Sequence, residues 1–292
     1  MNFDTGKRLL TLCEMHEIPI SEAMRRRERT TLEADVEETE ERMQRAWSIM
    51  KQAVHAALDE KPKSMGGLIG GEAGKLDRFR RLGRNICGPV ISKAVAYAMG
   101  VLEVNASMGL IVAAPTAGSS GVIPGVFLAV QEEFGFTDAE MVNGLFNAGA
   151  VGYLISRNAT VAGAEGGCQA EVGTAAAMAA SALTELFGGS PSMCLDAASY
   201  TIANLLGLVC DPIAGLVEAP CQKRNAIGAS AALTSAEMAL AGIKGIIPFD
   251  ETVKAMYTVG RKLPLELRET ALGGMAATPT GCGLCKEIYK EV

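Results

Sequence analysis

The stretch TAAAMAASALTELF (residues 174–187) consists mostly of alanine, leucine and methionine, and it contains neither glycine nor proline. Such residues lose little conformational freedom in a helix, so the stretch predicts a strong helix in an apolar setting. Thr137 with Glu140 forms a capping-box signature that opens another helix. Alternation of apolar and polar residues, which marks strands, is almost absent from the chain. We therefore predict the all-α fold class.

The rest of the chain divides into a charged N-terminal part and an apolar body. Apolar residues recur at helical spacing within residues 5–60, whose opposite face is charged, so we expect amphipathic helices packed on the body. The glycine-rich break KPKSMGGLIGGEAGKL (61–76) ends this part, and Ala/Gly-rich stretches dominate residues 85–285. No clear linker separates the two parts. We predict one helical domain over residues 1–292, with Gly-rich loops around a buried site.

Composition excludes several classes of function. The chain of 292 residues has a formal net charge of −6, and its basic run RRRER (25–29) is followed at once by acidic residues. Nothing there would neutralise a run of phosphates, so we expect no nucleic-acid partner. Residues 104–131 lack charged side chains, but Pro115 and Pro124 argue against a membrane span. Without a signal-peptide pattern at the N-terminus, we expect a cytoplasmic protein with no membrane partner.

Eight cysteines without an export signal indicate reduced thiols or metal ligands. Three of them, Cys168, Cys210 and Cys221, lie among small, mostly uncharged residues, in GAEGGCQAEVG (163–173) and CDPIAGLVEAPCQKRNAIGA (210–229). Glycine at these positions leaves room for a bulky inorganic group beside the backbone. Three thiolates would leave one metal position open to a substrate, as catalytic sites do. The cysteines interpreted as ordinary packed thiols are Cys13, Cys87 and Cys194.

Cys282 and Cys285 form a Cys-x-x-Cys pair near the C-terminus. The pair fits a redox dithiol, half of a zinc site, or a tail that reaches a metal. The chain has no second such pair and only two histidines, His16 and His55, so a structural zinc site fits poorly. A pyridoxal-phosphate enzyme also fits poorly, because no lysine stands in a Schiff-base motif beside a phosphate-binding loop.

Four motifs, in order along the chain, resemble the α subunit of the iron–sulfur-dependent L-serine dehydratases, or L-serine ammonia-lyases. They are SMGGLIGGEAGKL (64–76), NASMGLIVAAPTAGSSGVIPG (105–125) and the two cysteine segments, and the match extends to RETALGGMA (268–276). The resemblance implies a 4Fe–4S cluster on Cys168, Cys210 and Cys221, with one iron open to L-serine. It also implies a separate β subunit, and therefore a hetero-oligomer that degrades an amino acid in the direction of gluconeogenesis.

The implied reaction places several side chains in candidate roles. An open iron would act as a Lewis acid on the serine hydroxyl while a base removes the α-proton. The segment TAGSSG offers backbone N–H groups and hydroxyls as a carboxylate cradle, although from local sequence a tight turn is equally consistent. The candidates for substrate binding are Thr116, Ser119, Ser120, Gly121 and Asn225, and those for catalysis are Lys223 and Arg224.

The general base stays unassigned at this stage, because neither histidine lies in a motif. Other ionisable groups near the motifs are Glu72, Lys75, Glu165 and Glu171, and the partner subunit is a further source. Cys282 or Cys285 is a possible tail ligand that occupies the open iron until substrate displaces it. Two alternatives stand beside the serine lyase: a cysteine desulfidase or related amino-acid lyase on the same cluster, and a non-catalytic redox module.

Overall fold

A computed structural model describes residues 1–31, 35–59 and 62–290. Over these residues the regular elements are helices, and no strand is present beyond an isolated bridge between Cys210 and Arg268. The predicted all-α class is confirmed for this part of the chain. No helix in these ranges combines the length and apolarity needed to cross a membrane.

The N-terminal helices pack against the body, mainly on α5 (Gly88–Ala106) and α7 (Asp138–Asn158). They are α1 (Gly6–His16), α2 (Ile20–Thr31) and α3 (Val36–Asp59). Trp47 and Val54 of α3 are buried, whereas Val36 at its first residue is exposed. The Glu38 N–H donates to Asp35 Oδ1 at 3.0 Å, so Asp35 satisfies one of the free donors at the start of α3.

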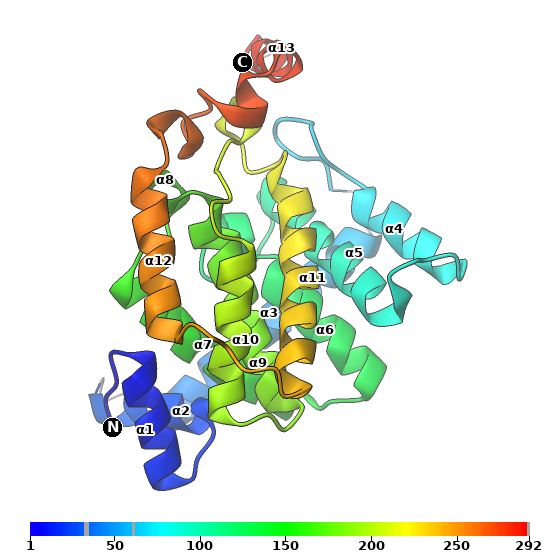
Figure 1. The fold of residues 1–292 in the computed structure, drawn as a ribbon. Helices are drawn as coiled ribbons and strands as arrows, with labels where there is room; N and C mark the ends of the chain where they lie inside the picture. The colour runs from blue at the N-terminus through cyan, green and yellow to red at the C-terminus, as the bar shows by residue number, and fades with distance from the viewer. Residues whose placement is uncertain (32–34, 60–61, 291–292) are drawn as a thin grey trace.

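The body is a bundle of helices around α9 (Thr174–Leu186), the helix predicted from the alanine-rich stretch. Side chains from Thr174 to Thr184 are buried, because other helices surround α9 on several sides. Figure 1 shows α10, α11 and α12 side by side across one face of this bundle. The body helices are α4 (Glu72–Arg81), α5 (Gly88–Ala106), α6 (Val122–Phe134), α7 (Asp138–Asn158), α8 (Gly163–Gly166), α10 (Pro191–Asn204), α11 (Cys221–Leu240), α12 (Phe249–Lys262) and α13 (Pro279–Ile288).

Short turns complete the structure, and most of them lie beside the cysteine segments. The capping box predicted at Thr137 and Glu140 is present at the start of α7. The π-helical turn η2 precedes α9, and such turns are frequent at functional sites. The short turns are η1 (Ala117–Ser119), η2 (Gln169–Gly173), η3 (Ile213–Gly215), η4 (Leu265–Leu267) and η5 (Gly274–Ala277).

Within the predicted break at residues 61–76, the described residues 62–71 form a loop and α4 begins at Glu72, so the helix begins inside the stretch. The buried Glu218 carboxylate folds this loop, because it accepts the N–H groups of Gly66 at 2.6 Å and Leu68 at 2.9 Å. It also accepts the Ser64 hydroxyl at 2.7 Å. The loop is thereby attached to the segment that carries Cys221.

A second buried carboxylate, Glu103 of α5, fixes the end of the same loop. It accepts the N–H groups of Gly71 and Ala73, both at 2.9 Å, and the side-chain amide of Gln222 at 2.8 Å. Burial raises the pKa of Glu103, which these donors oppose. The start of α4 is therefore held against α11 one residue beyond Cys221.

Helices α5 and α6 cross at close range because glycines occupy the crossing. A Cβ placed on Gly125 would lie 2.7 Å from the backbone nitrogen of Ala98, and one on Gly121 would lie 2.2 Å from the Ala98 carbonyl oxygen. A side chain at either position would force the two helices apart. This crossing places the N-terminus of α6 and the TAGSSG segment.

Replacing Gly125 with alanine should destabilise the protein by roughly 1–3 kcal/mol, because overpacking at the crossing exceeds the gain in helix propensity. The matched control is Gly149→Ala in α7, where an added Cβ meets no atom within 4 Å. That control should be stabilising by about 0.5–1 kcal/mol. Urea unfolding followed by circular dichroism measures both changes, and a stabilised Gly125→Ala protein would contradict the close crossing.

Candidate active site

The structure brings Cys168, Cys210 and Cys221 together from three separate segments. Cys168 directly precedes η2, Cys221 is the first residue of α11, and Cys210 lies in the connection between α10 and α11. All three thiols are buried. Burial raises the pKa of Cys168 and of Cys221 to about 12, and it raises the pKa of Cys210 further, with repulsion from the neighbouring thiolates adding to it.

Two of the three thiols lie at the starts of helical segments. Cys168 is the N-terminal neighbour of the η2–α9 segment, and Cys221 begins α11 directly after Pro220. Backbone N–H groups and the helix dipole favour negative charge at such positions. The helix starts therefore reduce the cost of a thiolate at both positions, although burial outweighs them and keeps both pKa values raised.

Cys210 is held by the C-terminal segment rather than by a helix. Its N–H donates to the Leu267 carbonyl at 2.9 Å, and its own carbonyl accepts the Glu269 N–H at 2.7 Å. The neighbouring Asp211 carboxylate accepts the Met275 N–H at 2.6 Å. Residues 267–275 thus fix the connection on which Cys210 stands.

Arg224 of α11 contacts the connection between α10 and α11, which carries Cys210. Its guanidinium forms an ion pair with the buried Asp211 at 2.7 Å and donates to the Val209 carbonyl at 2.9 Å. Its positive charge also lowers the pKa values of Cys168 and Cys221, against the larger effect of burial. Arg224 therefore anchors the segment between Cys210 and Cys221, here called the cysteine loop, and it offsets part of the thiolate charge.

The TAGSSG segment lies beside the cysteines as η1 and the start of α6. The Thr116 and Ser119 hydroxyls are 3.0 Å apart, and Thr116 donates to Glu171 Oε1 at 2.7 Å. Ser120 is fully buried, and its hydroxyl has no hydrogen-bond partner among the described residues. A buried hydroxyl in this condition is available to a ligand.

Asn225 connects this segment to α11. Its side-chain amide donates to the carbonyls of Gly118 at 2.8 Å and Cys221 at 3.0 Å, and its oxygen accepts the Gly121 N–H at 3.1 Å. Asn225 is fully buried, so these bonds fix its orientation. The predicted substrate residues Asn225 and Gly121 therefore bond to each other, and Asn225 holds the loop beside Cys221.

Glu171 joins the two halves of the site. Its Oε1 accepts the Thr116 hydroxyl, and its Oε2 lies 3.9 Å from Cys210 Sγ. A Cβ on Gly163 would lie 2.8 Å from Glu171 Oε2 and 3.1 Å from Cys210 Sγ, so glycine is required beside this contact. Burial raises the pKa of Glu171. The thiols and the TAGSSG segment thus form one site, with Glu171 between them.

Three predicted site residues are not brought against the cysteines by any hydrogen bond in the described part of the chain. Lys223 is exposed, and its ammonium lies 3.4 Å from Gln222 Oε1. Cys282 and Cys285 lie on α13, where the exposed Cys282 thiol donates to the Ala276 carbonyl at 3.7 Å.

The three cysteines do not form a ready site for a single metal ion. Within the described ranges, no three His, Cys, Asp or Glu side chains form a group that could hold one metal ion. In a cluster each thiolate binds a different iron atom, so the ligands surround a volume rather than a point. The buried cysteines Cys168, Cys210 and Cys221, which come from separate segments, are the residues that could serve as such ligands.

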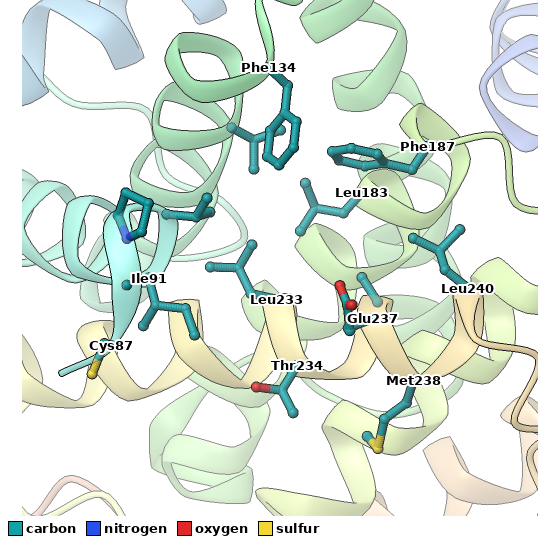
Figure 2. A pocket seen from close by; sticks show the side chains of 15 residues that line it. Cys87, Ile91, Phe134, Leu183, Phe187, Leu233, Thr234, Glu237, Met238 and Leu240 are labelled. Atoms are coloured by element: carbon teal, nitrogen blue, oxygen red, sulfur yellow. The ribbon is translucent and has the colours of Figure 1, made fainter.

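A groove away from Cys168, Cys210 and Cys221 has few polar side chains in its lining. Figure 2 shows Phe134 and Phe187 facing Leu233 and Glu237 of α11 across a groove of about 670 Å³. Its lining is mostly aliphatic and aromatic, and none of the predicted site residues takes part in it. The groove is therefore not the candidate active site.

Comparison with known proteins identifies the relatives of this chain. A family model described as "Serine dehydratase alpha chain" matches residues 15–276. The chain is 48% identical over 287 residues to a probable L-serine dehydratase, alpha chain, of Bacillus subtilis (strain 168), covering 98% of this chain and 95% of that one. It is 42% identical to the L-serine dehydratase, alpha chain, of Peptoniphilus asaccharolyticus, with 99% of each covered. An L-serine dehydratase of Streptomyces coelicolor is 36% identical over 96% of this chain, which spans 62% of that longer protein.

Replacing Asn225 with aspartate should lower the free energy of unfolding by roughly 3 kcal/mol, because a buried carboxylate would then face two carbonyl oxygens. The control is Asn143→Asp on α7, whose side-chain oxygen already accepts from Arg25 at 2.6 Å. That exposed change should stay within about 0.5 kcal/mol of the wild type. Thermal unfolding of both variants provides the measurement, and equal effects would refute the bracing role of Asn225.

Proposed function

Because this chain belongs to the serine dehydratase alpha chain family, we propose that it deaminates L-serine to pyruvate and ammonia. The proposed cofactor is a 4Fe–4S cluster held by Cys168, Cys210 and Cys221. The observation that carries the proposal is the convergence of three buried cysteines with the TAGSSG segment through Glu171. It joins a metal-binding donor set to groups suited to a small polar substrate.

When bound, the cluster supplies a Lewis-acidic iron for the departing serine hydroxyl. Loss of the α-proton and of the β-hydroxide, which together make one water, then leaves aminoacrylate, whose imine tautomer is hydrolysed to pyruvate and ammonia. The chain's own residues bind and orient the substrate. The Ser120 hydroxyl and the η1 backbone are the groups proposed to hold the substrate carboxylate, with Thr116, Ser119 and Asn225 fixing the segment.

The two predicted catalytic residues have different support. Arg224 is proposed to offset thiolate charge and to anchor the cysteine loop, on the strength of its contacts with Asp211 and Val209. Lys223 is exposed, and its one contact among the described residues is with Gln222, so the geometry gives its catalytic role no support. The general base that accepts the α-proton comes from the partner subunit or from another residue of this chain.

A partner polypeptide is part of the proposal. The printed names of two relatives call them alpha chains, and the longer Streptomyces coelicolor protein contains a substantial additional part within one polypeptide. We propose that a separate β subunit supplies the corresponding part here, giving a cytoplasmic hetero-oligomer.

The C-terminal cysteines are proposed as a displaceable ligand of the open iron. The helix that carries them rests on the cysteine loop, since Tyr289 donates to the Ala214 carbonyl at 2.9 Å. Replacing both Cys282 and Cys285 with serine should lower the apparent KM for L-serine or remove a lag in activation. Unchanged kinetics would remove this part of the proposal.

Anaerobic co-purification with the neighbouring gene product, followed by iron and sulfide analysis and a pyruvate assay, tests the function. Pyruvate from L-serine in preference to L-cysteine is the expected result. Preference for L-cysteine would indicate a desulfidase, and a loaded protein that releases ammonia from neither amino acid would indicate a redox module.

Replacing Cys168, Cys210 or Cys221 singly with serine should remove most of the bound iron and acid-labile sulfide, because each cysteine is one of three ligands. The matched control is Cys87→Ser, which changes an exposed thiol at the start of α5. Chemical iron and sulfide determination in oxygen-free samples gives the measurement. A full cluster in all three variants would contradict the ligand assignment.

A further inference from the structure

Glu171 is a mostly buried carboxylate without a cationic partner. Its neighbours are the Thr116 hydroxyl at Oε1 and the Cys210 thiol at Oε2, and no ion pair to it occurs among the described residues. The other ionisable group that acts on it, Glu269, is also acidic. The nearby guanidinium, Arg224, is already paired with Asp211.

An unpaired carboxylate in such a place is costly. Desolvation of a charge is compensated only when an opposite charge or several donors replace water. The other buried carboxylates in this region have such partners: Glu218 and Glu103 each accept three hydrogen bonds, and Asp211 has Arg224. Glu171 receives one hydroxyl hydrogen bond and one weak thiol contact, so its Oε2 has capacity for a further donor.

Two glycines lie against this carboxylate, so no side chain from either position covers it. Gly163 and Gly118 flank the carboxylate, and a Cβ on either would lie 2.8 Å or 3.2 Å from it. Ser120, whose buried hydroxyl has no partner among the described residues, belongs to the same TAGSSG segment as Thr116. The site therefore combines an acceptor for a cation with a hydroxyl and η1 backbone suited to a carboxylate.

We propose that Glu171 binds the α-ammonium group of the substrate, and that it makes the site selective for 2-amino acids over 2-hydroxy acids of the same shape. The inference rests on the proposed function, because it assigns one contact within that site. Charge decides the selectivity: an ammonium forms an ion pair with Glu171, whereas a hydroxyl in its place leaves the carboxylate uncompensated.

The test compares two unreactive ligands that differ at the 2-position alone, L-alanine and L-lactate. Both lack the β-hydroxyl, so neither is turned over. The anaerobic enzyme with its partner subunit is titrated with each ligand, and the shift in its thermal midpoint gives the dissociation constant. The variant is Glu171→Gln, which keeps the shape and removes the charge. The control is Glu165→Gln, which makes the same change at an exposed position.

Wild type and the Glu165→Gln control should bind L-alanine more tightly than L-lactate. Glu171→Gln should lose roughly 10- to 100-fold in affinity for L-alanine and change little for L-lactate, as expected when a charged hydrogen bond is removed. The KM for L-serine should rise in parallel. Equal weakening of both ligands, or an unchanged preference, would overturn the assignment.

Two further outcomes separate this inference from the proposed function. A wild type that makes no pyruvate from L-serine would refute the function itself. A wild type that is active, with a Glu171→Gln variant that keeps its preference for L-alanine, would refute the role of Glu171 alone. If Glu171→Gln does not assemble, Glu171→Asp replaces it, because a retracted carboxylate should retain part of the preference; full retention would count against the role of Glu171.

Discussion

Compensation of buried negative charge is the constraint on which the rest of this structure depends. Three thiols and four carboxylates, Glu103, Glu171, Asp211 and Glu218, lie within or directly beside one site. Backbone N–H groups of the glycine-rich loop satisfy two of the carboxylates, Arg224 satisfies a third, and helix N-termini face two of the thiols. Polar contacts thereby bind the glycine-rich loop to Glu218, in the segment that carries Cys210 and Cys221, and the TAGSSG segment to Asn225 of α11. Buried carboxylates order the loops by accepting their N–H groups, and the helices hold these carboxylates in place.

Small residues make this arrangement possible. The alanines of α9 allow neighbouring helices to surround it, and Gly121 and Gly125 let α5 and α6 cross with their backbones almost in contact. The same crossing sets the position of the TAGSSG segment. Packing in the bundle and placement of the TAGSSG segment are therefore parts of one geometry, and a change in the crossing moves that segment directly.

The sequence was sufficient for the helical class, the buried alanine-rich helix and the start of α7, because these depend on local propensity and capping. It also predicted Cys168, Cys210 and Cys221 as one group, because their small, mostly uncharged neighbours set them apart from the other five cysteines. It did not locate the start of α4 within residues 61–76, since two distant carboxylates fix that loop. Nor could it rank Glu171 above Glu165, because the difference is burial and contact with Thr116. In the sequence, the buried carboxylates are marked by acidic residues within otherwise mostly uncharged stretches, such as Asp211 and Glu218.

The backbone pairing between Cys210 and residues 267–269 has a consequence for the timing of assembly. Cys168, Cys210 and Cys221 belong to the middle and later parts of the chain, yet the loop between α10 and α11 is fixed by residues near its end. A ribosome that has translated all three cysteines has not yet produced the segment that orders them. Order in this loop therefore follows translation of residue 275, and a nascent chain stalled before that residue would expose its cysteine thiols to oxidation.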